Sequence, residues 1–159
     1  METARRWACV SHLSGKNACW QNRRETGRRM GERLVHILFV ENHAAFRQAA
    51  SHLMDREADL EVVAQGGSVR EGREKMAQGD IDAAIVSVPL PDEGAAEMVG
   101  ELHRANPSIP VLVLSRAEDS EIREEFVGAG ASEVLSKECT FVQILTAVRR
   151  LGGEAQRLR

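Results

Sequence analysis

Five short apolar runs recur along residues 34–151, and each is followed by a polar or glycine-containing stretch. Three of them are apolar almost throughout, which is typical of strands that helices cover on both faces. The other two are shorter and mixed, which is typical of strands nearer a sheet edge. The predicted strands span residues 35–40, 60–64, 81–86, 111–114 and 133–135.

The segments between these runs place apolar residues at helical spacing. Ser68 with Glu71 three residues later has the pattern of a capping box, which predicts a helix start. Five strand–helix units in strict alternation predict a doubly wound, three-layer α/β/α fold. We expect five parallel strands in the order 2-1-3-4-5. The predicted helices span residues 44–56, 68–78, 93–105, 119–128 and 140–151.

Composition limits the class of protein. The chain has 159 residues, of which 43% are hydrophobic and 28% charged, as in one globular domain. No apolar run reaches the roughly 18 residues of a membrane span, and the N-terminus lacks the apolar core of a secretory signal. We therefore expect a cytoplasmic protein. Cys9, Cys19 and Cys139 share no metal-ligand spacing with the histidines, so they indicate reduced, incidental thiols.

Charge divides the chain into unequal parts. Residues 1–33 contain eight basic and three acidic side chains, which gives +5; the whole chain carries −3, so the remainder carries −8. The first segment also lacks hydrophobic periodicity. We predict a flexible basic extension over 1–33, a folded domain over 34–151 and a short tail over 152–159. The extension could be a basic tether or lie upstream of a true start near Met30. The acidic remainder argues against direct nucleic-acid binding by the folded domain.

Polar residues follow four of the predicted strands. Glu41 and Asn42 come after the first, and Ser87 ends the third. Ser115 follows the fourth strand, and Lys137 follows the fifth. Sites in open parallel sheets lie outside the carboxyl ends of the strands, at the switch point of the strand order. We therefore expect these five side chains to form one site.

The motifs around these residues resemble the receiver domain of bacterial two-component response regulators. The resemblance covers residues 34–151 and is greatest to receivers that precede a LuxR-type helix-turn-helix. Four segments carry it together, in order and on the correct strand ends. They are Ile37-Leu38-Phe39-Val40-Glu41-Asn42-His43, Ile85-Val86-Ser87-Val88-Pro89-Leu90-Pro91-Asp92, Val111-Leu112-Val113-Leu114-Ser115 and Val134-Leu135-Ser136-Lys137.

The resemblance implies a role for each position. The acidic pair that holds Mg²⁺ in receivers falls on Glu41 and Asn42. The aspartate that accepts phosphate from a histidine kinase falls on Ser87. The hydroxyl that contacts the phosphoryl group and the conserved lysine are matched by Ser115 and Lys137. The switch aromatic falls on Val134.

Three of these positions depart from the family pattern, because Asn42 and Ser87 stand where receivers have carboxylates and Val134 stands where they have an aromatic residue. Serine is not ionised at neutral pH, and the sequence offers no general base beside Ser87. We therefore expect that this site does not undergo the phosphorylation that receivers undergo on an aspartate. With carboxylates missing at positions 42 and 87, Glu41 is the only acidic ligand candidate, and Mg²⁺ binding should be weak at most. We expect no other cofactor and no catalytic residue, and we expect Lys137 to pair with Glu41. The chain is then an atypical pseudo-receiver.

Other functions remain open. A serine hydrolase would need small residues around Ser87, as in G-x-S-x-G, and a flavodoxin-like nucleotide or small-ligand domain would normally show a glycine-rich first loop. Asp82 and Asp92 are alternative phosphate acceptors, but neither stands at the carboxyl end of its strand. The chain could also be the receiver fragment of a LuxR-type transcriptional regulator.

A pseudo-receiver should act through protein contacts. We expect a protein partner or a homodimer, no membrane, and an uncertain role for a sensor kinase. Two surfaces are candidates. One is the face of the fourth helix, fifth strand and fifth helix, where Val134 would help to form a constant apolar patch. The other surrounds Ala45, Ala49 and the last helix.

Overall fold

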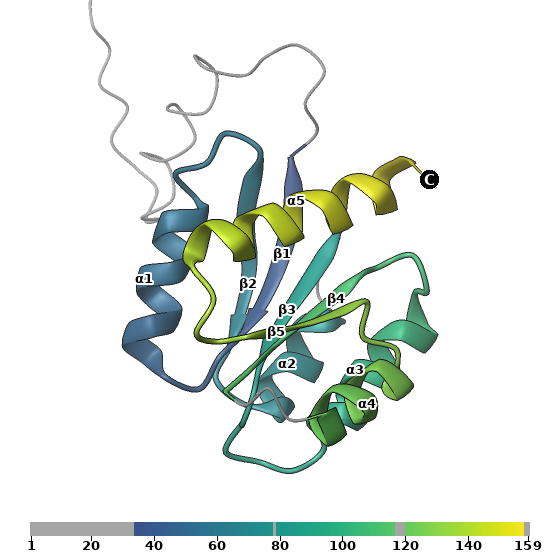
Figure 1. The fold of residues 1–159 in the computed structure, drawn as a ribbon. Coiled ribbons are helices and arrows are strands. Elements are labelled where there is room, and N and C mark those ends of the chain that lie inside the picture. The colour runs from purple at the N-terminus through teal and green to yellow at the C-terminus, as the bar shows by residue number, and fades with distance from the viewer. Residues whose placement is uncertain (1–33, 78, 117–119, 158–159) are drawn as a thin grey trace, which may run out of the picture. The chain divides into compact units, whose positions relative to one another are not determined.

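The strands form one five-stranded sheet in the order β2-β1-β3-β4-β5, and every neighbouring pair is parallel. The computed structural model describes residues 34–77, 79–116 and 120–157 (Figure 1). The predicted strand order and alternation are confirmed. In chain order the elements are β1 (Val35–Val40), α1 (Ala44–Met54), β2 (Leu60–Gly66), α2 (Val69–Met76), β3 (Ala83–Ser87), α3 (Ala95–Ala105), β4 (Val111–Ser115), α4 (Ser120–Ala129), β5 (Glu133–Ser136) and α5 (Phe141–Arg157).

The sheet separates two hydrophobic cores, because successive side chains of a strand point to opposite faces. Ile37 and Phe39 of β1 pack with α1 and α5 in one core. Leu38 and Val40 pack with α2, α3 and α4 in the other. All four of these side chains are fully buried. Helices on both faces therefore explain why the central strands are apolar almost throughout.

Side chains cap α1 and α2 where these helices begin, at the carboxyl end of the sheet. The His43 Nδ1 atom accepts the backbone N–H of Phe46 and starts α1. Ser68 Oγ accepts the N–H of Glu71 at 3.1 Å, which confirms the predicted cap of α2. The Glu71 carboxylate reaches the N–H of Gly67, not that of Ser68 as in a standard capping box.

A second cap of α2 comes from a distant part of the chain. The Asp92 carboxylate, in the loop after β3, accepts the N–H groups of Val69 and Arg70 at 2.7 and 2.9 Å. These are orphan donors of the first helical turn, and a carboxylate there is favoured by the helix dipole. The contact anchors the loop after β3 to the start of α2.

The last helix is longer than predicted. We expected it to end at Leu151, but α5 continues to Arg157, through much of the predicted tail. The predicted tail begins at Gly152. Gly152 is instead a packing residue, because a Cβ atom there would lie 2.6 Å from Val35 Cγ1. Its missing side chain lets α5 approach β1 closely.

Two further observations concern the predicted organisation. The basic extension over residues 1–33 lies outside the described residues, so that part of the domain division remains a prediction. None of the described helices has the length and apolar character needed to cross a membrane.

Candidate functional site

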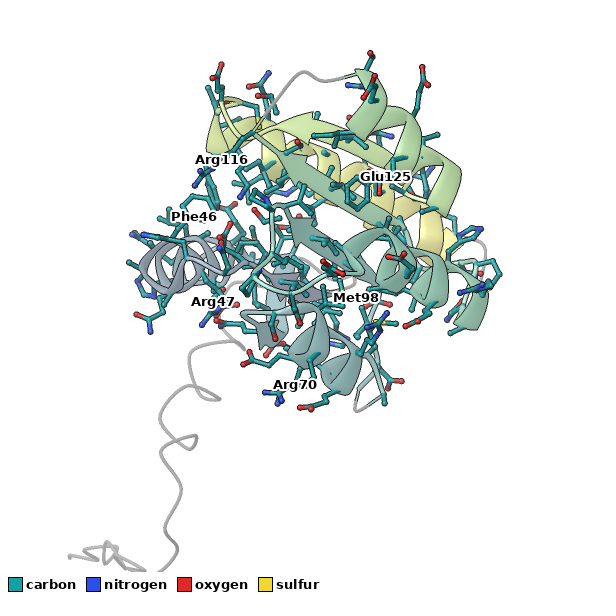
Figure 2. All side chains as sticks on the ribbon, turned by 90° about the horizontal axis from the view of Figure 1, so that it is seen from below. Phe46, Arg47, Arg70, Met98, Arg116 and Glu125 are labelled. Carbon is teal, nitrogen blue, oxygen red and sulfur yellow. The ribbon has the colours of Figure 1, made fainter. Side chains whose placement is uncertain are left out.

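The carboxyl end of the sheet brings together most of the predicted site residues. Glu41 follows β1, Ser87 ends β3 and Ser115 ends β4, and all three are buried. Lys137 follows β5, and its backbone N–H donates to the Ser115 carbonyl at 2.7 Å. Figure 2 views the domain from this end.

Glu41 is the central charged group of the site. Its Oε1 atom accepts the N–H of His43 at 2.8 Å, and its Oε2 atom lies 3.3 Å from Lys137 Nζ. The predicted pairing of Lys137 with Glu41 is thereby confirmed. Burial alone would raise the pKa of Glu41, but the Ser87 hydroxyl, the His43 N–H and the Lys137 ammonium outweigh it and lower that pKa. The carboxylate is therefore held in its ionised form.

Ser87 lies at the end of β3 and is fully buried. Its hydroxyl lies beside the Glu41 carboxylate and helps to lower the pKa of that group. Its Oγ atom nevertheless falls outside strict hydrogen-bonding geometry with every described protein atom. In the described part of the chain, no histidine or lysine is hydrogen-bonded to this hydroxyl. The only group of basic character beside this hydroxyl among the described residues is the Glu41 carboxylate, whose lowered pKa makes it a weak base for activating a serine.

Asn42 is the predicted site residue whose side chain lies at the surface. It is exposed next to the buried Glu41, and none of the side-chain hydrogen bonds found among the described residues involves its amide. The pair of acidic ligands expected from the receiver pattern is thus reduced to one buried carboxylate and one surface amide.

Arg47 is a site residue that sequence reasoning missed. It lies in the first turns of α1, and its Nη1 atom donates to the backbone carbonyl of Glu41. Figure 2 shows Arg47 at this end of the sheet, together with Arg70 of α2 and Arg116 after β4. The periodicity of α1 gave no signal for this contact, because a long side chain can reach a carbonyl from a half-exposed helical position.

Val134, at the position of the switch aromatic, does not form a surface patch. Its side chain is only 5% exposed and packs in the core beneath α4 with Phe126. The expectation that it contributes to an exposed apolar face is wrong. Its carbonyl oxygen, on the outer edge of β5, accepts a hydrogen bond from Arg123 of α4 at 3.1 Å. This contact ties α4 to the edge strand.

The two alternative aspartates are engaged elsewhere. Asp82 lies at the opposite end of the sheet, where its Oδ2 accepts the N–H of His36 at 3.0 Å and lies 3.4 Å from His36 Nδ1. Asp92 caps α2, which lowers its pKa. Both positions agree with the expectation that neither aspartate replaces Ser87. Across the described residues, no three histidine, cysteine, aspartate or glutamate side chains form a group that could hold a metal ion.

Comparison with known sequences shows similarity to response regulators. The family model for the response regulator receiver domain matches residues 37–149. The transcriptional activator DevR/DosR of Mycobacterium tuberculosis is 27% identical over 120 residues, covering 76% of this chain and 55% of that protein. The regulatory protein UhpA of Salmonella typhimurium is 28% identical over 115 residues, 72% of this chain and 57% of that protein. The chain thus spans little more than half the length of these relatives.

Solved structures share the fold. A CheY-like receiver domain from Methanospirillum hungatei superposes with a TM-score of 0.71 at 18% identity, covering 79% of this chain and 99% of that one. A DNA-binding response regulator of the LuxR family from Staphylococcus aureus gives a TM-score of 0.69 at 16% identity, covering 75% and 99%. The order of the strands, the polar residues at their carboxyl ends and the family match lead to one conclusion: this chain belongs to the response regulator receiver domain family.

Proposed function

We propose that this domain is a pseudo-receiver, which acts in two-component signalling through protein contacts and without phosphorylation of an aspartate. The observation that carries the proposal is the buried Ser87 at the end of β3, where the family pattern has the phosphate-accepting aspartate. The domain provides a binding surface and has no catalytic residue. A cytoplasmic location is part of the proposal.

The chemistry of the residues around Ser87 supports this function. Transfer of a phosphoryl group from phosphohistidine needs a carboxylate nucleophile and a divalent cation that gathers the phosphoryl oxygens. Ser87 offers a neutral hydroxyl, and the one neighbouring carboxylate, Glu41, is committed to Lys137 and to the His43 N–H. An acyl phosphate cannot form on a serine. The carboxylate beside the Ser87 hydroxyl, that of Glu41, has a lowered pKa and is paired with Lys137, which makes it a weak base for activating that hydroxyl.

The donor set does not fit Mg²⁺, which the family implies. This ion favours six oxygen ligands in near-octahedral geometry and usually takes one or two carboxylates from the protein. At this site only Glu41 supplies a carboxylate, and both of its oxygens already accept hydrogen bonds from nitrogen donors. The positive charge that balances Glu41 comes from the Lys137 ammonium group. We therefore assign no step to a bound metal ion.

Without a phosphoryl group, phosphorylation cannot shift the domain between two states, since such a shift requires a ligand with different affinities for them. The contact between Arg123 and the Val134 carbonyl supports a single arrangement of α4 against β5. Val134 also has no aromatic ring that could turn inward, as the switch aromatic of receivers does. The partner-binding surface is accordingly constitutive.

A phosphorylation assay tests the proposal. The protein is incubated with acetyl phosphate and Mg²⁺, and its intact mass is measured before and after hydroxylamine, which cleaves acyl phosphates. The expected result is no added phosphoryl mass. A mass increase that hydroxylamine removes would show that another carboxylate accepts phosphate, and the pseudo-receiver proposal would fail.

A second candidate is the receiver portion of a LuxR-type transcriptional regulator. The curated relatives are named as transcriptional regulators, and the matched region covers 55–57% of DevR/DosR and UhpA. In that case the same surface would contact an output module. Immunoblotting of native extracts with an antibody raised against residues 34–157 separates the two candidates by the mass of the protein detected.

A further inference from the structure

We propose that a groove beside β2, at the edge of the sheet, binds a free α-amino acid with a large apolar side chain. The groove has a volume of about 550 Å³, which lies in the range of small-ligand sites. It lies between β2 and the end of α2 with the chain that leads to β3, and it shares no residue with the site around Ser87. The inference therefore goes beyond the proposed function. Its lining includes His36, Val63, Ala64, Lys75, Asp80 and Ile81.

The groove exists because α2 leaves part of its face of the sheet uncovered. His36, Leu38 and Val40 of β1 point to this face, since side chains alternate along a strand. Leu38 and Val40 are fully buried, and a Cβ atom at Gly72 of α2 would lie 3.2 Å from Val40 Cγ2. The His36 side chain, nearer the start of β1, is 36% exposed. The polar residue of this apolar strand thus lies where the cover of the helix ends.

Asp82 holds the ring of His36 in one orientation. Its Oδ2 atom accepts the backbone N–H of His36 at 3.0 Å and lies 3.4 Å from His36 Nδ1. The imidazole therefore turns Nδ1 toward Asp82, and Nε2 is the ring nitrogen left for a ligand. A proton held on Nδ1 by the carboxylate makes Nε2 an acceptor in the neutral ring, which suits an ammonium donor.

Two side chains of opposite charge line the groove without an ion pair. Lys75, in the last turn of α2, is half-buried, and Asp80 before β3 is exposed. In the part of the chain that the structure describes, neither belongs to an ion pair, whereas Arg73 of the same helix pairs with Glu101. The helix dipole favours a cation at the end of α2 but does not account for the anion. A ligand that carries both a carboxylate and an ammonium group would pair with both.

The other lining residues indicate an apolar side chain on the ligand. Ala64 and Ile81 belong to the core below α2 and also line the groove. The register between β1 and β2 shifts between Ile37 and Leu38, so that Val63 has no partner in β1. A bulge of this kind re-aims a side chain, and Val63 is 44% exposed in the groove. An aromatic or branched aliphatic side chain would cover these three apolar residues.

Amide NMR spectra of the full chain, titrated with L-phenylalanine and separately with L-leucine, measure the binding. Amide signals of Ala64, Gln65, Lys75 and Asp80 should shift and saturate. The Kd should be about 1 mM or below, as for a small ligand in an open site. Two analogues of phenylalanine test the charges. 3-Phenylpropionate lacks the ammonium group and 2-phenylethylamine lacks the carboxylate, and each should bind about fivefold more weakly, since each loses one charged contact.

Variants assign each charged group of the ligand to a side chain. Lys75→Met should weaken L-phenylalanine binding about fivefold and leave 2-phenylethylamine unchanged, because that analogue has no carboxylate. Asp80→Asn should weaken L-phenylalanine similarly and leave 3-phenylpropionate unchanged. A general disturbance of the fold would weaken all three ligands alike. Arg70→Met and Glu74→Gln are matched controls, because they change charges of α2 outside the groove, and they should leave all three ligands unchanged.

Several results would overturn the inference. One is the absence of amide shifts with either amino acid at about 10 mM, roughly ten times the expected Kd. Another is an equal loss of binding in a control variant, or a loss for all three ligands in Lys75→Met. Shifts confined to Leu102, Ala105 and Asn106 would place the ligand in the neighbouring groove between α2 and α3 instead. None of these results depends on phosphorylation, so the proposed function is tested separately.

Discussion

Lys137 Nζ lies 3.3 Å from Glu41 Oε2, although the two residues follow β5 and β1, which are separated in the sheet by β3 and β4. The pair thus spans the carboxyl end of the sheet and links the segments that follow β1 and β5. Glu41 is only 2% exposed and the Lys137 side chain 18%, so water screens the pair less than a surface ion pair. A buried pair adds little by itself, but removing one member leaves an uncompensated charge.

The first prediction concerns this pair. Glu41→Gln removes the charge that compensates Lys137 and should lower the free energy of unfolding by about 1–3 kcal/mol. Lys137→Met should cost a similar amount, because Glu41 then remains buried without its cation. Urea denaturation monitored by circular dichroism measures both effects. The double variant should lose less than the sum of the two losses, and strict additivity would show that the residues are not coupled.

The second prediction is a pH dependence. The pKa of Glu41 is lowered in the folded state, so the unfolded chain binds more protons in mild acid. Stability from this group is fully present above the ordinary glutamate pKa of about 4.3 and is lost as pH falls through the folded value. The urea midpoint should therefore fall on acidification below that range, and less steeply in Glu41→Gln. Glu125→Gln, an exposed change on α4, should retain the wild-type slope.

The third prediction rebuilds the missing carboxylates. Ser87→Asp alone restores the nucleophile position but leaves Asn42 in the metal site, so we expect little or no acyl phosphate. Ser87→Asp combined with Asn42→Asp supplies three carboxylates with Glu41, and should show Mg²⁺-dependent stabilisation and a hydroxylamine-sensitive mass increase with acetyl phosphate. Differential scanning fluorimetry and intact mass measure the two effects. Equal phosphorylation of the single variant would show that Asn42 does not weaken the site.

Much of the fold and part of the site could be predicted from sequence, for specific physical reasons. Strand periodicity places residues 41, 87, 115 and 137 at one sheet edge, because carboxyl ends of parallel strands coincide. The pairing of Glu41 with Lys137 follows from that placement, and the lack of a second carboxylate follows from residue types alone.

Other features depend on three-dimensional reach and could not be read from the pattern. Arg47 and Arg123 use long side chains to bond carbonyl groups on other elements, and spacing along a helix does not reveal such contacts. Val134 is predicted to form part of an apolar patch, whereas α4 covers its side of β5 and buries it with Phe126. Gly152 begins the predicted tail but lies inside α5, where its missing side chain allows close packing against Val35.

The fourth prediction concerns Arg149, which binds α5 to the segment after α1. Its side chain is about two-fifths exposed and contacts Asp59 and Glu57 through three hydrogen bonds. The Arg149 guanidinium lowers the pKa of Asp59. Because solvent screens an exposed network, Arg149→Ala should cost only about 1 kcal/mol of unfolding free energy. Arg157→Ala, at an exposed position at the end of α5, should cost less. Added salt should shrink the difference between the two variants.

The last prediction uses two adjacent glycines of α5 that differ in surroundings. Alanine is favoured over glycine in a helix by about 1 kcal/mol, so each substitution would stabilise the chain if packing allowed it. A Cβ atom at Gly153 would meet no heavy atom within 4 Å, whereas one at Gly152 would lie 2.6 Å from Val35 Cγ1 and 3.1 Å from Cγ2. Gly153→Ala should therefore raise the free energy of unfolding by about 0.5–1 kcal/mol. Gly152→Ala should lower it by about 1–3 kcal/mol, because Val35 is buried in β1 and cannot move away without disturbing the core. Urea denaturation of both variants gives the comparison. Equal stabilisation by the two substitutions would show that α5 does not pack on β1 at Gly152.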